Sequence, residues 1–167
     1  AQKFSHLPAI KIDNRFISYG ELIDKAMRVA SALLEAGACN ETIGLVGQRK
    51  ASSYIGLLGI IFAGCNYTPV NPKYNSSRIS DIINGANIQY LVGDLNDIEK
   101  LNNSATSGIK LCILPEGNCP NDRSLTFTNG DNLAHNKYLV EPINSNGSDL
   151  AYINFTSGTT GTPKGVM

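Results

Sequence analysis

The chain has 167 residues, of which 42% are hydrophobic and 17% charged, a composition typical of a globular protein with one sizeable core. Fourteen scattered basic residues are balanced by fourteen acidic ones, which argues against a nucleic-acid-binding surface. No apolar run approaches the ~20 residues of a membrane helix and no signal-peptide pattern begins the chain, so we expect a cytoplasmic protein with no membrane partner.

The first predicted helix begins after Ser18. Ser18 and Glu21 have the spacing of a capping box, in which the two residues satisfy free amides at a helix start. Apolar residues then recur on one helical face, namely Leu22, Ala26, Val29, Ala30 and Leu33. Gly37 is expected to end this helix.

Short apolar strands and helices then alternate. We expect strands at 43–46, 88–92 and 109–114, and helices at 51–63, from 76 or 77 to 85, and at 94–101. The helix 51–63 is apolar nearly all round, which predicts that it packs between other elements, and Gly64 should end it. Ser76 or Ser77 is the expected cap of the next helix. This alternation indicates an α/β fold with a mainly parallel sheet.

Two prolines interrupt the pattern after the second helix. Pro69 and Pro72 prevent a helix and favour an extended course with edge-strand or loop character. Asn71, between them, can form side-chain-to-backbone turn bonds. The stretch 115–149 is rich in Asn, Gly, Asp and Ser, and we expect a short strand or helical turn within it, at 125–127 or 131–135.

The cysteines are predicted to be structural free thiols. They lack Cys-x-x-Cys spacing, and only two histidines accompany them, so neither a disulfide framework nor a metal site is expected. The four are Cys39, Cys65, Cys112 and Cys119.

The last stretch carries the chemistry. An apolar run at 150–155, predicted as a strand fixed in the sheet, leads into a loop rich in glycine and hydroxyl groups. Glycines let backbone N–H groups turn inward around an anion, and hydroxyls and a lysine add donors. The candidate phosphate-binding residues are Thr156, Ser157, Gly158, Thr159, Thr160, Gly161 and Lys164. A flexible linker, the alternative, would need neither the strand before the loop nor the Pro-Lys-Gly after it.

The spacing excludes a Walker loop, because Lys164 follows a proline and precedes a glycine. From Thr156 onward the chain closely resembles the Thr-Ser-Gly-Thr-Thr-Gly-x-Pro-Lys-Gly-Val signature of the adenylate-forming superfamily, which includes acyl-CoA synthetases, luciferase-type ligases and adenylation domains of nonribosomal peptide synthetases. Residues 17–22 resemble its early Leu-[Thr/Ser]-Tyr-x-Glu-Leu segment. Residues 63–72 resemble its second motif, except that Val70 and Asn71 replace the usual leucine and aspartate.

The resemblance implies layered helices on a mainly parallel sheet within a large N-terminal AMP-binding domain. Residues 1–167 would be the first part of that domain, with its remainder and the C-terminal domain absent. The superfamily's catalytic lysine lies in the mobile C-terminal domain, so no catalytic residue is expected in this chain, which should be inactive alone.

The implied activity of the full protein is that of an ATP-dependent acid–thiol ligase. With Mg2+ and ATP it would convert a small carboxylic acid or amino acid into an acyl-adenylate and pyrophosphate. It would then pass the acyl group to a thiol, either phosphopantetheine on a carrier-protein domain or coenzyme A. Lys164 would offset charge on pyrophosphate, or else anchor the loop. We expect 156–165 to be mobile when empty and to order on ATP.

Three hypotheses remain for the full protein. The first two are an amino-acid adenylation domain and an acyl- or aryl-CoA synthetase. The run 63–92, with its Pro-x-x-Pro, its Arg78-Ile79 pair and the strand that follows, resembles amino-acid adenylation domains more than fatty acyl-CoA synthetases. The third hypothesis is an inactive fragment kept for binding or assembly. The rest of the same enzyme is an expected partner of the chain.

Overall fold

The computed structural model describes residues 2–12, 14–101, 105–120, 125–129, 141–144, 146–156 and 164–166. Within these ranges the elements follow in the order η1 (Gln2–Phe4), β1 (Pro8–Ile12), β2 (Arg15–Ser18), α1 (Tyr19–Glu35), β3 (Thr42–Val46), α2 (Ala51–Phe62), β4 (Asn66–Val70), α3 (Ser76–Gly85), β5 (Tyr90–Gly93), α4 (Leu95–Ile98), β6 (Leu111–Leu114), β7 (Phe127–Asn129), β8 (Asn154–Thr156) and β9 (Lys164–Val166). The predicted 131–135 segment lies outside them. The expected alternation of strands and helices is confirmed.

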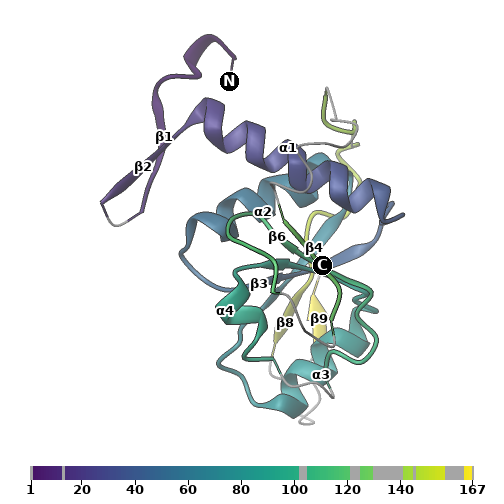
Figure 1. Cartoon of the computed structure of the whole chain (residues 1–167). Coiled ribbons are helices and arrows are strands. Elements are labelled where there is room, and N and C mark those ends of the chain that lie inside the picture. Colours follow the sequence, from purple (N-terminus) through teal and green to yellow (C-terminus); the bar gives the residue numbers. More distant parts are fainter. Residues whose placement is uncertain are drawn as a thin grey trace.

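A five-stranded parallel sheet forms the centre, with strand order β4-β3-β5-β6-β7. Helices α1 and α2 cover one face and α3 covers the other (Figure 1). Among the strands of this sheet, β3 comes first in the chain, and it lies inside the sheet with β4 on one side and β5 on the other. The sheet therefore has a doubly wound strand order, in which the direction of the chain connections reverses between β3 and β5. In such folds ligands bind in a crevice at this switch point.

Strand residues alternate between two hydrophobic clusters. Ile43 and Leu45 of β3 pack with α1 and α2, whereas Val46 packs with α3. The same division separates Val92 from Leu91 on β5. Successive side chains of a strand point to opposite faces of the sheet. Because helices cover both faces here, every position of a central strand is buried, which requires a continuous apolar run.

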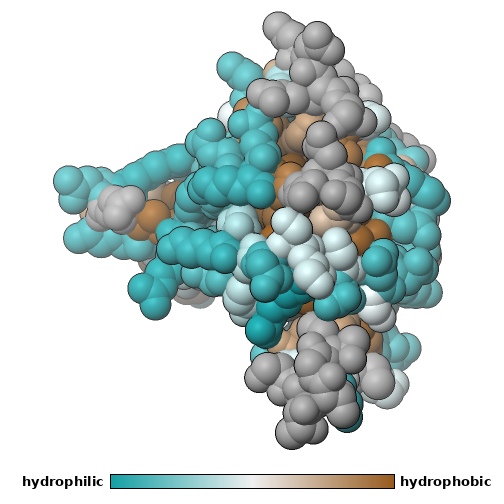
Figure 2. All heavy atoms as spheres, turned by 90° about the horizontal axis from the view of Figure 1, so that it is seen from below, coloured by the Kyte–Doolittle hydropathy of each residue, from teal (hydrophilic) through white to brown (hydrophobic). Residues whose placement is uncertain are grey.

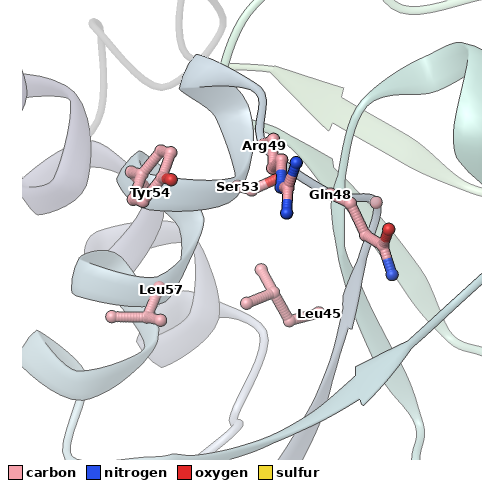
Figure 3. Close-up of a pocket in the computed structure, with 7 residues that line it drawn as sticks. Leu45, Gln48, Arg49, Ser53, Tyr54 and Leu57 are labelled. Atoms are coloured by element: carbon pink, nitrogen blue, oxygen red, sulfur yellow. The ribbon is translucent and has the colours of Figure 1, made fainter. Parts of the chain in front are cut away.

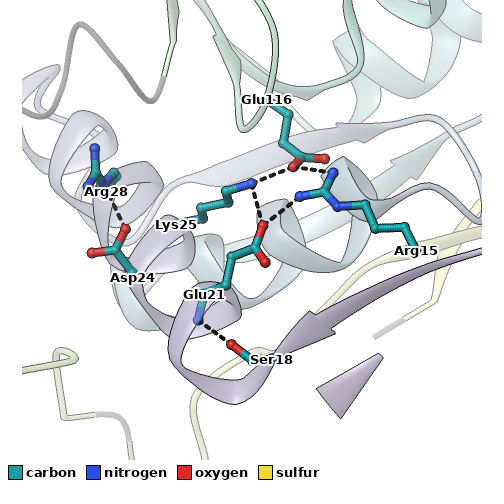
Figure 4. A network of polar contacts seen from close by, with 7 residues as sticks. All are labelled: Arg15, Ser18, Glu21, Asp24, Lys25, Arg28 and Glu116. Atoms are coloured by element: carbon teal, nitrogen blue, oxygen red, sulfur yellow. Dashed lines mark hydrogen bonds and ion pairs between the residues drawn. The ribbon is translucent and has the colours of Figure 1, made fainter. Parts of the chain in front are cut away.

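Helix α1 begins as the sequence predicts. The Oγ of Ser18 accepts a hydrogen bond from the Glu21 amide at 3.2 Å. The carboxylate of Glu21 pairs with Arg15 and Lys25, at 2.5 and 2.9 Å, and Glu116 accepts from the same two cations (Figure 4). This network ties α1 to the β1–β2 hairpin, which the sequence analysis missed, and to the segment after β6.

One of two local predictions needs correction. Asn75, not Ser76 or Ser77, caps α3, because its extended backbone lets Oδ1 accept the Arg78 amide at 2.9 Å. Helix α2 packs between α1 and the central sheet, as expected: Gly59 lies against Val29 of α1, and Gly56 lies against Val92 of β5. Tyr54 and Ile61 are its exposed large apolar side chains.

The surface carries further apolar side chains. Phe16, Tyr152 and Val166 are each at least half exposed. Seen from below, hydrophobic atoms show in a band through the middle of the face, between hydrophilic atoms (Figure 2). No helix among the described residues is long and apolar enough to cross a membrane.

The cysteines are free thiols, as predicted. Cys65 and Cys112 are buried, and burial raises the pKa of the Cys112 thiol to about 12. Both therefore act as small core residues.

Candidate phosphate-binding hairpin

Strands β8 and β9 pair antiparallel and form the base of the candidate loop. Thr156 lies opposite Lys164, and the Thr156 Oγ1 donates a hydrogen bond to the Lys164 carbonyl oxygen at 3.4 Å. This register brings together the two residues at the ends of the loop. Both residues are exposed, so the Lys164 amine is available to a ligand, whereas the Thr156 hydroxyl already donates within the hairpin.

The segment before β8 is attached to the edge of the central sheet. The Tyr67 amide of β4 donates to the Ala151 carbonyl at 3.2 Å, and the Ile153 amide donates to the Tyr67 carbonyl at 2.9 Å. The rings of Tyr67 and Tyr152 stack with centroids 5.7 Å apart. The hairpin is therefore held at a defined place beside β4.

The predicted strand 150–155 is wrong in its extent and partner. Only a single bridge, between Tyr67 and Tyr152, joins it to β4, and the strand that follows pairs with β9 in a separate two-stranded sheet. The reason lies in β4: the next outward-facing amide would belong to Pro69, and proline has no N–H to donate. Pairing therefore stops and the chain turns away.

Packing then holds β8 against α3. The ring of Phe155 lies against Gly85, where an added Cβ would meet Cε1 at 3.2 Å. Across the hairpin, a Cβ on Gly165 would lie 3.0 Å from Cγ2 of Ile153. Glycine at position 165 thus lets β9 lie close over the side chains of the neighbouring segment.

The structure positions two of the seven predicted phosphate-binding residues, Thr156 and Lys164, and brings them together. The others lie outside the described residues, namely Ser157, Gly158, Thr159, Thr160 and Gly161. Within the described ranges, no group of three or more His, Cys, Asp or Glu side chains could hold a metal ion.

The turn after β4 forms as predicted. The Oδ1 of Asn71 accepts from the Lys73 amide at 3.0 Å, and the Tyr74 amide donates to the Asn71 carbonyl at 3.1 Å. Asparagine therefore supplies the turn bonds without a carboxylate at this position.

A second polar cluster, at the carboxyl ends of β3 and β5, was missed. Lys50 pairs with Asp94 at 2.8 Å and with Asp97 at 2.9 Å, and Lys100 pairs with Asp97 at 2.7 Å. Burial alone would raise the pKa of Asp97, but the bonds from the two lysines more than offset it, so this pKa lies below its usual value. The signal was present in the sequence, since Lys50 comes four residues after the end of β3 and Asp94 directly follows β5.

The doubly wound parallel sheet, with a two-stranded hairpin attached beside β4, defines an α/β protein of the open-sheet class. The sequence profile described as AMP-binding enzyme matches residues 1–167. The chain belongs to the AMP-binding enzyme family, as the resemblance of its motifs predicts.

Relatives in sequence cover the whole chain. It is 30% identical over 168 residues to tyrocidine synthase 3 of Brevibacillus parabrevis and 33% identical over 170 residues to bacitracin synthase 1 of Bacillus licheniformis. Each comparison covers 100% of the chain, which spans only 2% and 3% of the length of these two relatives.

Solved structures share the fold. The anthranilate CoA ligase AuaEII, in complex with anthranoyl-AMP, superposes with a TM-score of 0.81 at 21% identity, covering 98% of this chain and 32% of that one. The nonribosomal peptide synthetase FmoA3 superposes with a TM-score of 0.75 at 19% identity, covering 99% and 16%. The expected α/β fold with a mainly parallel sheet is thereby confirmed.

Proposed function

We propose that the chain is part of an ATP-dependent enzyme that activates a carboxylate as its adenylate. A carboxylate oxygen of the substrate attacks the α-phosphorus of ATP, the bond to the β-phosphate oxygen breaks, and pyrophosphate leaves. The observation that carries this proposal is the Thr156–Lys164 pairing, which joins the two ends of the phosphate-binding signature in a family of AMP-binding enzymes.

The residues of the hairpin would bind and orient the β- and γ-phosphates. Lys164, exposed at the base of the loop, would offset the negative charge that develops on pyrophosphate. Backbone amides and hydroxyls of residues 156–161 would supply further donors. This is catalysis by positioning and charge, and Mg2+ bound with ATP would neutralise part of the phosphate charge.

We propose an amino acid as the substrate and a carrier-protein thiol as the acceptor. The names of the sequence relatives, synthases of tyrocidine and bacitracin, support this choice over coenzyme A. The thiolate of carrier-bound phosphopantetheine would attack the acyl carbonyl and release AMP. Residues 1–167 would then lie in the N-terminal AMP-binding domain, with the other substrate contacts elsewhere in the intact protein.

ATP–pyrophosphate exchange by the intact protein tests the proposal. A panel of amino acids, aryl acids and fatty acids is supplied one at a time with Mg-ATP and labelled pyrophosphate. Exchange that depends on one amino acid supports the assignment. If exchange occurs only with an aryl or fatty acid, and the acid then forms a thioester with coenzyme A, the protein is an acyl- or aryl-CoA synthetase instead. Absence of exchange with every acid would contradict activation and favour a binding or assembly role.

A further inference from the structure

A pocket of about 370 Å3 lies at the carboxyl end of β3, and none of the described hairpin residues lines it. It is lined by Leu45, Gly47, Gln48, Arg49, Ser53, Tyr54 and Leu57. Ser53, Arg49 and Gln48 lie along one side, and Leu45 and Leu57 lie across from them (Figure 3). The volume falls in the range of small-molecule sites, which combine an apolar wall with a few polar groups.

Among the described residues, Arg49 is a cation without an ion-pair partner, and it lies between two balanced charge networks. Arg15 belongs to the network with Glu21, Lys25 and Glu116, which has two positive and two negative groups. Lys50 belongs to the network with Asp94, Asp97 and Lys100, which is balanced in the same way. Arg15, Arg49 and Lys50 border one neighbouring pocket, yet Arg49 itself joins no ion pair within the described chain. Its charge is therefore free to pair with an anion.

The surrounding backbone also favours an anion. Helix α2 begins at Ala51, two residues after Arg49, and its N-cap residue, Lys50, makes no side-chain capping bond. The Ser53 amide donates to the Lys50 carbonyl at 3.1 Å, which leaves the Ala51 and Ser52 amides as the first-turn donors for an anion. The Oγ of Ser53 is buried and has no hydrogen-bond partner among the described atoms. The pocket sits beside β3 of the switch point, where doubly wound sheets bind ligands.

The remaining wall selects for an apolar group. Leu45 and Leu57 present aliphatic carbon, and Tyr54, a residue that is 42% exposed, also lines the pocket. A bare inorganic anion would leave these surfaces in water, whereas an aromatic or aliphatic body would cover them.

We propose that this pocket binds a small organic anion, a phosphate monoester or a carboxylate whose charged group pairs with Arg49 and whose apolar body lies on Leu45, Leu57 and Tyr54. The ligand would bind independently of the nucleotide. This second site does not depend on the activity proposed above.

Calorimetric titration of the intact protein with phenyl phosphate and with benzoate tests the site and distinguishes the two head groups. Arg49→Gln should weaken binding of the preferred probe roughly tenfold or more, because a charge-assisted contact is lost. Arg49→Lys keeps the charge and should retain part of the affinity. Lys110→Gln removes an exposed cation at the amino-terminal edge of the sheet and should change nothing.

Two further measurements separate this site from the hairpin. Tyr54→Ala should weaken phenyl phosphate roughly threefold and leave inorganic phosphate unaffected, since only the aromatic contact is removed. Saturating Mg-ATP should leave the affinity for phenyl phosphate unchanged. The proposal is overturned if neither probe binds up to about 10 mM, if Arg49→Gln binds as tightly as the unaltered protein, or if Mg-ATP displaces the probe.

Discussion

Thr156 and Lys164 lie opposite each other on β8 and β9, and the hydroxyl of one donates to the carbonyl of the other. The residues that flank the glycine-rich loop therefore lie side by side at its base. A polyphosphate held by the intervening backbone would be within reach of both.

Lys164→Ala should lower the ATP–pyrophosphate exchange rate of the intact protein at least tenfold, which corresponds to about 1.4 kcal/mol from one lost charge-assisted contact. The thermal stability should not change, because the side chain is exposed. Lys110→Ala is the matched control and should exchange normally. An unchanged rate in Lys164→Ala would assign this lysine a structural role.

Mg-ATP should slow amide hydrogen exchange in residues 156–165 of the intact protein. The nucleotide would supply acceptors for the N–H and O–H groups of the signature. The Ile153 amide, which already donates to the Tyr67 carbonyl, serves as the internal reference and should keep its protection. If the signature is as protected as Ile153 before ATP is added, a pre-formed site replaces the ligand-ordered one.

Gly59→Ala should destabilise the fold by about 1–2 kcal/mol, although alanine gains roughly 1 kcal/mol of helix propensity over glycine. An added Cβ would lie 2.6 Å from Val29 Cβ and 2.8 Å from the Ala26 carbonyl oxygen, so α1 would have to move. Chemical denaturation gives the free energy of unfolding. Gly108→Ala, where no atom lies within 4 Å, is the control and should have little effect. Equal stability of both variants would show that α1 and α2 adjust freely.

Asp97→Asn should reduce the stability by about 1–3 kcal/mol at neutral pH, since Lys50 and Lys100 lose a buried partner. The pKa of Asp97 is lowered in the folded state, so its contribution is present above the unfolded value near 3.8 and is lost as the pH falls through the folded value. Unfolding curves from neutral to acidic pH should therefore converge for the variant and the unaltered protein.

Asp24→Asn is the control for this comparison. Asp24 pairs with Arg28 one helical turn away on α1, at a more exposed position, and its loss should change stability by less than about 0.5 kcal/mol. Parallel pH profiles for Asp97→Asn and the unaltered protein would exclude the carboxylate as a source of acid sensitivity.

The sequence predicted the elements whose signals are local. Ser18 with Glu21 marked the start of α1, Gly64 marked the end of α2, and Asn71 predicted its turn. The cap of α3 was misplaced by one residue or more because Asn75 and the two serines after it are all good capping residues. Backbone conformation, which propensity does not give, decides among them.

Features that depend on distant residues could not be read in the same way. The apolar run at 150–155 has strand character, but its pairing is limited by Pro69 on β4. Likewise, the sequence does not show which basic residue lacks an acidic partner. Arg15 and Lys50 pair with carboxylates from other elements, whereas Arg49 has no such partner in the described chain. The phosphate signature was recognised because its residues are contiguous.

The attachment of residues 151–153 to Tyr67 spans a long stretch of sequence and consists of two backbone bonds and one ring contact. Contacts within β3, α2, β4 and α3 close much shorter loops, so this sheet can assemble before the attachment forms. We therefore expect the hairpin to dock late during folding and to detach first when the protein is warmed. The strand order of the central sheet would survive that detachment, and nucleotide binding would be lost before the core unfolds.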